Sequence, residues 1–290
     1  MKLTHTQAVF LMVAITLMWS IAGVVTRQLE HARSFEVTFW RSFFTALSLL
    51  VILPLLQGRA LLAKVRAGGW PLWLSGLCWA VMFTAFMVAL TLTSVANVLV
   101  TMAISPLLTA LLARVFVGHR IPARTWLAIL AAGAGIAWMY GSDMQADELA
   151  GTLIALGVPI ASAINWTISQ RSHARGRRVD LVPSVLVGAV LSSLATLPLA
   201  LPFQASGHDI ALLALLGLVQ LAIPCALVVV CARVLKAPEV ALLALLEVIF
   251  GIALAWVGAG EVPGRTVLAG GALVIVALVF NELVGWRQRL

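Results

Sequence analysis

Residues 70–90 read WPLWLSGLCWAVMFTAFMVAL and contain no charged side chain. About 20 apolar residues in an α-helix cross a hydrocarbon core of about 30 Å, so this stretch predicts a membrane-spanning helix. A strand of a membrane barrel would instead alternate apolar and polar residues over about 10 positions. The stretch therefore favours an all-α polytopic membrane protein.

Similar apolar runs recur along the chain. Of its 290 residues, 62% are apolar and only 10% are charged, with a mean hydropathy of +1.07. A water-soluble domain carries about 25% charged residues, so a soluble enzyme is excluded. The sequence predicts ten spans: Ala8–Thr26, Phe35–Leu56, Trp70–Leu90, Val95–Val117, Trp126–Tyr140, Ala150–Gln170, Leu181–Leu201, Ile210–Ala232, Val240–Gly258 and Val267–Val284.

The distribution of positive charge predicts the orientation of these spans. With the N-terminus inside, 15 of the 19 Lys and Arg residues fall on the inner side. Arg27, Arg33 and Arg265 fall outside, and Arg41 lies within a span. Because Lys and Arg concentrate in cytoplasmic loops, we expect both termini in the cytoplasm of a multi-pass protein of the bacterial inner membrane. No loop is long enough to read a nucleic acid, so the expected partners are the bilayer and a small-molecule substrate; a monomer suffices for both.

The chain matches itself at an offset of 142 residues, with span boundaries that coincide without a gap. Examples of identical pairs are Ala8 with Ala150, Ser20 with Ser162, Gln28 with Gln170 and Val98 with Val240. Five spans in each half require the second half to enter the membrane from the opposite side. The sequence thus predicts two inverted five-helix repeats, residues 1–145 and 146–290, in a single membrane domain. Such repeats are common in secondary transporters, with a substrate site between the halves. A scaffold that transports nothing is the alternative.

Polar residues at four-residue spacing mark the fourth span. Residues four apart share one face of a helix. The stripe is Asn97, Thr101, Ser105 and Thr109, and the repeat places Glu239, Leu243, Glu247 and Gly251 at equivalent positions of the ninth span. We interpret the two stripes as walls of a shared central space. The alternative is that the hydroxyl groups bond carbonyls of their own helix and that Asn97 bonds a neighbouring helix.

Two charged residues lie inside predicted spans, where charge is costly unless it is paired or hydrated. Glu247 could couple protons or hold a substrate ammonium group, or it could bond to backbone groups or to Arg41. Arg41 could bind a substrate carboxylate, or it could extend to the outer membrane interface.

Large aromatic residues accompany polar ones in three spans. Trp19 adjoins Ser20 in the first span, and Trp166 adjoins Asn165 in the sixth. Trp79 shares the third span with Met82. Aromatic walls with a few polar groups suit an apolar or aromatic substrate, whereas packing or lipid contact is the alternative reading.

Four prolines within the predicted spans indicate kinks, either as hinges or as fixed bends. They are Pro106, Pro159, Pro183 and Pro224.

No enzyme signature stands out. The five histidines lie in or beside loops and predict no metal cluster. A phosphate-binding GKS or GKT motif is absent, so the chain does not itself hydrolyse ATP. We therefore expect neither an enzyme nor a bound metal or cofactor.

Several segments resemble motifs of the drug/metabolite transporter superfamily, in its ten-helix EamA branch. They are Leu17–Gly23 (LMWSIAG), Phe39–Arg41 (FWR), Thr93–Ala96 (TSVA), Ser105–Leu111 (SPLLTAL), Leu246–Phe250 (LEVIF) and Gly260–Pro263 (GEVP). His119 replaces the Glu that the family pattern has after Gly118, and Val248 replaces the Pro that follows Glu247.

The resemblance implies export of small metabolites through a central cavity. Within the branch, the chain looks most like the YddG-type exporters of aromatic and other neutral amino acids. The residues that this resemblance and the patterns above favour for the site are Trp19, Ser20, Trp79, Met82, Asn97, Thr101, Ser105, Asn165, Trp166 and Glu247, with Arg41 as a charge partner. A drug or cation, or a sugar or nucleotide derivative, remains the alternative cargo.

Overall fold

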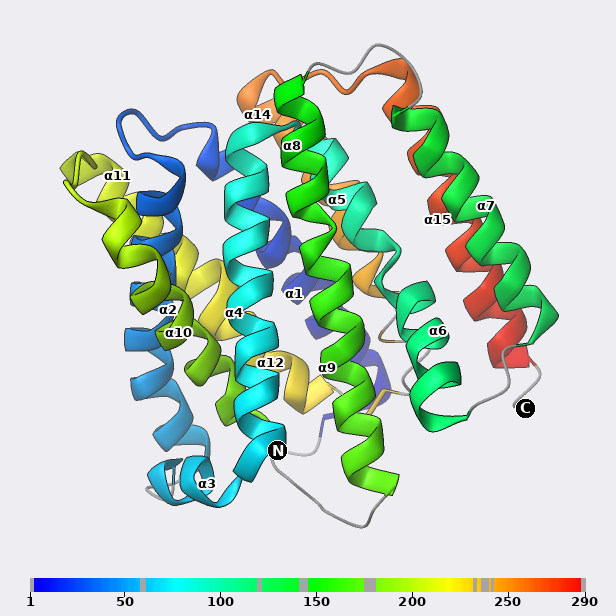
Figure 1. The fold of residues 1–290 in the computed structure, drawn as a ribbon, viewed down its shortest axis with the longest axis horizontal. Helices are drawn as coiled ribbons and strands as arrows, with labels where there is room; N and C mark the ends of the chain where they lie inside the picture. The colour runs from blue at the N-terminus through cyan, green and yellow to red at the C-terminus, as the bar shows by residue number, and fades with distance from the viewer. Residues whose placement is uncertain are drawn as a thin grey trace.

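The computed structural model describes residues 3–57, 61–118, 122–140, 146–174, 181–231, 234–235, 240 and 243–287. All regular elements in these ranges are helices (Figure 1). In chain order they are α1 (His5–Thr26), α2 (Ser34–Gln57), α3 (Leu61–Ala67), α4 (Gly69–Leu92), α5 (Val95–Ala103), α6 (Ser105–Val117), α7 (Ala123–Tyr140), α8 (Ala146–Ala155), α9 (Gly157–Ala174), α10 (Pro183–Ala200), α11 (Gly207–Leu215), the π-helix η1 (Leu216–Ala222), α12 (Ile223–Cys231), α14 (Leu246–Ala259) and α15 (Arg265–Arg287).

The helices fit the predicted spans. Within the described ranges, eight helical stretches are long and apolar enough to cross a membrane. Two shorter apolar helices, Ala123–Trp138 and Leu246–Ala259, lie where the fifth and ninth spans are predicted. Helix α1 begins and α15 ends at the lower end of the molecule in Figure 1. The chain is an all-α membrane protein.

Apolar side chains cover the outside of the helices, and several charged side chains lie inside. Large apolar side chains such as Leu55 and Val257 are exposed at 80% and 87%, whereas the charged side chains of Glu36, Arg41 and Asp209 are buried. In hydrocarbon, charged and polar groups must find partners inside the protein, and apolar groups can face outward. The functional residues are therefore to be sought in the interior.

Helix contacts in one half of the chain are repeated in the other. Helix α1 packs on α14, and its counterpart pair α8–α9 packs on α5–α6. Helix α4 packs on α8–α9 and α10, while η1, at the equivalent place in the second half, packs on α1 and α2. Helices α7 and α15 pack on each other at one edge of the molecule (Figure 1). The division into two inverted repeats stays a prediction, which these contacts allow.

Three of the four prolines follow an interruption of a predicted span. The fourth span divides at Ile104, before Pro106, and the sixth divides at Leu156, before Pro159. Proline lacks an N–H group and its ring crowds the carbonyl of the residue four positions earlier, which ends or distorts a helix. The kink predicted at Pro183 is wrong, because Pro183 is the first residue of α10, where the N–H group has no intrahelical partner.

Pro224 accounts for the π-helix in the eighth span. Its ring crowds the carbonyl of Gln220, and the turn before it widens so that the Ile223 N–H group donates to the Leu218 carbonyl, five residues back. π-Helical turns are uncommon and occur frequently at functional sites. This feature was not predicted, and it places Gln220 in the interior.

Candidate functional site

Arg41 is the central feature of the buried polar interior. Its residue surface is only 1% exposed, so it does not extend to the membrane interface, and that sequence alternative is wrong. Its Nε and Nη2 atoms both donate to Oε1 of Gln220, at 3.1 and 2.7 Å. The guanidinium carbon lies 5.8 and 5.6 Å from the ring centres of Phe83 and Phe86. Cation–π contacts and one amide oxygen thus hold the cation.

Gln220 links Arg41 to the first helix. Its Nε2 atom donates to the backbone carbonyl of Trp19 at 3.3 Å. Sequence reasoning missed this residue, although a single amide in the apolar run Leu212–Ile223, four positions before Pro224, was an available signal. Helices α1, α2, α4 and η1 therefore meet at one guanidinium group.

One nitrogen of the Arg41 guanidinium group is left without a hydrogen bond among the described residues. Its Nη1 atom is buried and has no hydrogen-bond partner in the part of the chain that the structure describes. Among the described residues, no carboxylate forms an ion pair with Arg41. Glu247 of α14 is half-buried, and its charge interacts with Arg41 at longer range, without a direct contact. Arginine stays protonated in proteins, so the site holds a buried positive charge with a free donor edge.

Ser20 and Glu247 bring α1 and α14 together. The Ser20 hydroxyl oxygen lies 2.7 Å from the Thr16 carbonyl oxygen and 3.1 Å from the backbone carbonyl oxygen of Glu247. Gly251 of α14 faces α5, where a Cβ atom would overlap the end of the Leu99 side chain, and the same Cβ atom would lie 3.8 Å from the carbonyl oxygen of Ser20. These two predicted site residues therefore do lie side by side, where α1, α5 and α14 meet.

The polar stripe of the fourth span divides between two helices. In α5, Asn97 Nδ2 donates to Thr93 Oγ1 at 3.1 Å, its Oδ1 is buried without a partner, and Thr101 is buried. In α6, Ser105 donates to Ser162 of α9 at 2.8 Å, whereas Thr109 bonds the carbonyl of Ser105. The local alternative thus holds for Thr109. Glu239, the first residue of the equivalent stripe, lies outside the described residues, as does His119.

Asn165 has partners of a different kind. Its Oδ1 accepts from Ser75 of α4 at 2.6 Å, and the Ser75 hydroxyl also lies 2.8 Å from that of Ser184 on α10. This cluster joins α4, α9 and α10. Neighbouring residues of a helix point about 100° apart, so Trp166 does not share the environment of Asn165 and is 55% exposed. A role for Trp166 in the wall of a cavity stays a prediction.

The aromatic residues of α1 and α4 lie nearer to Arg41. Trp79 is half-buried, with its ring 5.5 Å from that of Phe83, which itself packs against the guanidinium group. Met82 is buried on the same helix, and Trp19 is half-buried on α1. The structure therefore brings Trp79 and the backbone of Trp19 to the Arg41 cluster.

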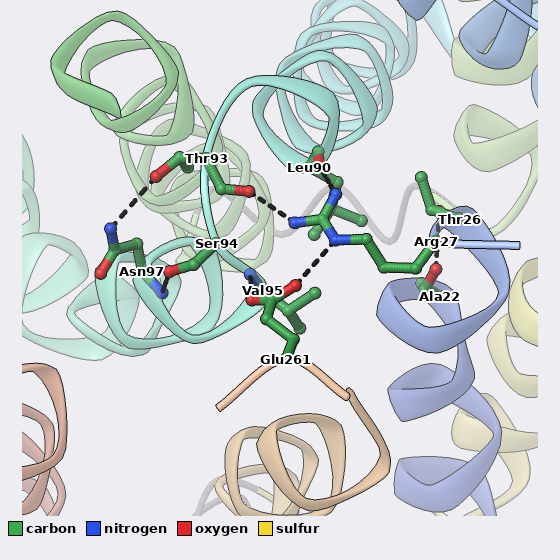
Figure 2. A network of polar contacts seen from close by, with 9 residues as sticks. All are labelled: Ala22, Thr26, Arg27, Leu90, Thr93, Ser94, Val95, Asn97 and Glu261. Carbon is green, nitrogen blue, oxygen red and sulfur yellow. Dashed lines mark hydrogen bonds and ion pairs between the residues drawn. The ribbon is translucent and has the colours of Figure 1, made fainter. Parts of the chain in front are cut away.

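A second polar network lies where α1 ends (Figure 2). Arg27 forms an ion pair of 2.7 Å with Glu261 and donates to the backbone carbonyls of Leu90 and Thr93. The other oxygen of Glu261 accepts from the backbone N–H of Val95 at 2.6 Å. These contacts, which we call the Arg27–Glu261 network, join α1, the α4–α5 junction and the loop after α14.

Asp209 and Glu36 anchor two neighbouring loops by a different route. The carboxylate of Asp209 accepts from the backbone N–H groups of Glu30, His31, Ala32 and Ser206, at 2.8 to 3.1 Å. Glu36 accepts in the same way from Gln204 and Ala205. The α1–α2 and α10–α11 loops are therefore held against α2 and α11.

The structure also gathers three potential metal ligands, against the sequence expectation that no histidine joins a metal cluster. Ligand atoms of Glu30, His208 and Asp209 lie within 4.8 Å of one another. Both oxygens of Asp209 are already occupied by backbone N–H groups, and Glu30 and His208 are exposed. The group is explained by loop anchoring without an ion.

Comparison with known proteins supports the fold and the class. A solved structure described as "Crystal structure of protein" aligns over 99% of this chain and 100% of its own, with a TM-score of 0.66 and 17% sequence identity. At that identity the likeness shows the fold alone. No curated protein matches the chain. The profile of the EamA-like transporter family matches residues 6–141. The chain is thus similar to the EamA-like transporter family over residues 6–141, slightly less than half of its length.

Proposed function

We propose that the chain is a secondary transporter that exports small metabolites, in particular neutral and aromatic amino acids, across the bacterial cytoplasmic membrane. The carrying observation is the repeated contact pattern of the two halves around a buried polar centre. Residues 1–145 and 146–290 form two inverted five-helix repeats, and both termini lie in the cytoplasm. Two halves of this kind supply two interchangeable conformations, which is what alternating access requires.

The substrate is proposed from the chemistry near the centre. Trp79, Phe83 and Phe86 supply apolar and aromatic surface beside a buried cation. Away from Arg41, beside the Arg27–Glu261 network, Asn97 has a buried amide oxygen with no hydrogen-bond partner among the described residues, which is an acceptor for a substrate ammonium group. A carboxylate with an apolar side chain fits the buried cation and the aromatic surface beside it, as in a neutral or aromatic amino acid.

Proteoliposomes test the function directly. Vesicles loaded with labelled phenylalanine, tryptophan or leucine should release label faster when they contain the protein than when they are protein-free. The same protein inactivated by heat before reconstitution controls for leakage. Equal release from both kinds of vesicle for every neutral amino acid would reject the proposed substrate.

A cationic or lipophilic drug is the competing cargo, and Glu247 is the observation that favours it, since a carboxylate inside a membrane protein can hold a cation. The substitution Glu247→Gln removes the charge and keeps the shape. It should abolish transport of a cation, and it should spare a zwitterion that does not use this carboxylate. Loss of ethidium release together with unchanged amino acid release would separate the two activities.

A further inference from the structure

The donor edge of Arg41 is the starting point. A guanidinium group has five N–H donors, and Gln220 engages the Nε side of the group through one oxygen. The Nη1 atom, with its two donors, is buried and has no partner among the described residues. The edge formed by Nη1 and Nη2 has the geometry to bind both oxygens of a carboxylate through parallel hydrogen bonds.

The charge balance of the site points to the same class of ligand. Removing one partner from a buried ion pair leaves a costly charge, and Arg41 has only a neutral amide in direct contact. The ring centres of Phe83 and Phe86 lie 5.8 and 5.6 Å from the guanidinium carbon, so aromatic faces but no anionic group of the described residues contact the cation. Glu247 interacts with Arg41 only at longer range, so an incoming anion would supply the direct ion pair that the described residues do not form, whereas an incoming cation would be repelled.

We propose that Arg41 and Gln220 form the carboxylate-binding subsite of this protein. Gln220 positions the guanidinium group and Arg41 binds the anion, so the cargo must carry a free carboxylate, with or without an amino group. The inference rests on the proposed function, since it assigns a substrate class to the transport site. It extends to Gln220, which no motif in the sequence marks.

The link from Gln220 to Trp19 gives the subsite a connection to α1. The amide of Gln220 bonds Arg41 through its oxygen and the Trp19 carbonyl through its nitrogen, so it cannot rotate without breaking one of the two contacts. Its orientation is therefore fixed by α1 and α2 together. This leaves Nη1 as the free end of the guanidinium group.

Four related compounds test the wild-type protein by thermal stabilisation, because a ligand that binds the folded state raises its melting temperature. They are phenylalanine, 3-phenylpropionate, phenylalaninamide and phenethylamine. The first two carry a carboxylate and should stabilise the protein; the last two lack one and should have no effect at the same concentration. Stabilisation by phenylalaninamide or phenethylamine equal to that by phenylalanine, or no response to either carboxylate, would overturn the proposal.

The substitution Gln220→Glu tests the subsite from the protein side. A glutamate there gives Arg41 an internal counter-charge but loses the bond to the Trp19 carbonyl, so the melting temperature without ligand is measured first to establish that the variant is folded. In the folded variant, carboxylate affinity should fall at least about tenfold. Gln204→Glu is the matched control, since Gln204 also accepts from an arginine, Arg33, at 2.8 Å on the exposed surface. Its carboxylate affinity should equal that of the wild type. An unchanged affinity in Gln220→Glu would assign Arg41 a purely structural role.

Transport measurements separate this inference from the proposed function. If the wild-type protein releases phenylalanine and phenylalaninamide from vesicles at equal rates, the proposed function stands and the carboxylate subsite is rejected. If carboxylates stabilise the protein but no amino acid is released, the subsite stands and the proposed transport of amino acids is rejected.

Discussion

Gly188 shows how closely two of the buried helices approach. A Cβ atom built on Gly188 of α10 would overlap the Cβ atom of Trp79 on α4 and would lie 2.9 Å from the carbonyl oxygen of Gly76. Neither neighbour is the flexible end of a side chain. The position therefore requires a residue without a side chain, because backbone and Cβ atoms cannot move aside individually.

We expect Gly188→Ala to destabilise the protein by about 1–3 kcal/mol through overpacking. A drop of a few degrees in melting temperature, measured in detergent, checks this. Gly133→Ala is the matched control, because no atom lies within 4 Å of a Cβ built there, and its melting temperature should not fall. Equal melting temperatures for the two variants would contradict the close packing of α4 and α10.

At the scale of single residues, the sequence identifies the unusual charged residues but not the side chains that bind them. Arg41 and Glu247 were predicted as exceptional because charge inside an apolar run is conspicuous. Gln220 was missed, since an amide in a membrane helix has several ordinary explanations and its partner is 179 residues away. Pairing across such a distance depends on how the helices pack, which composition does not specify.

Among the elements, the helical stretch α11–η1–α12 connects a local sequence feature to the site. Pro224 favours the widened turn that carries Gln220. An alanine at this position has an N–H group that can bond the Gln220 carbonyl and complete regular α-helical geometry. The change would rotate Gln220 relative to Arg41.

We therefore expect Pro224→Ala to weaken carboxylate-dependent stabilisation of the protein, while helix content by circular dichroism is kept. Pro183→Ala is the control, because the first residue of α10 needs no intrahelical hydrogen-bond donor. An unchanged response to 3-phenylpropionate in Pro224→Ala would show that the π-helix does not orient Gln220.

The Arg27–Glu261 network leads to a prediction about the ends of helices. The substitution Glu261→Gln removes an ion pair and weakens the bond to the Val95 N–H, so α1, α5 and α14 should separate more readily at this end. A cysteine at buried position 93 (Thr93→Cys) should then react faster with a maleimide than it does with Glu261 intact.

Glu30→Gln provides the comparison for that experiment, because Glu30 is an exposed acid outside the network. It should leave the labelling rate unchanged. If Glu261→Gln also leaves the rate unchanged, the network does not hold these helix ends together.

On the scale of the whole molecule, the proposed orientation predicts which loops face the cell exterior. His31 and Gln204 are exposed in the α1–α2 and α10–α11 loops, and Ala63 is exposed on α3. Single cysteines at 31 and 204 should react with a membrane-impermeant maleimide in intact cells. A cysteine at 63 should react only after permeabilisation. Labelling of position 63 in intact cells, or protection of 31 and 204, would reverse or reject the topology.

The helical, membrane-spanning class followed from the sequence because lipid imposes a length and an apolar composition on each span. The two inverted repeats inferred from the offset of 142 residues stay a prediction; equal spacing of spans would let equivalent helices make equivalent contacts, as α1 with α14 and α9 with α6 do. Interruptions at Ile104 and Leu156 were less well determined, because proline marks them only to within a few residues. The meeting of four helices at Arg41 came from the structure alone.

The Asp209 and Glu36 carboxylates and the Arg27–Glu261 network lie at the same end of the molecule but hold their segments by different kinds of contact. The carboxylates of Asp209 and Glu36 accept hydrogen bonds from six backbone N–H groups of their loops. Arg27 and Glu261 instead join three segments through an ion pair between side chains, which breaks when the helices repack. An antibody fragment raised against the loops held by Asp209 and Glu36 should recognise every state of the proposed transport cycle. One raised against the segments joined by the Arg27–Glu261 network should recognise a single state, and would serve to arrest the cycle there.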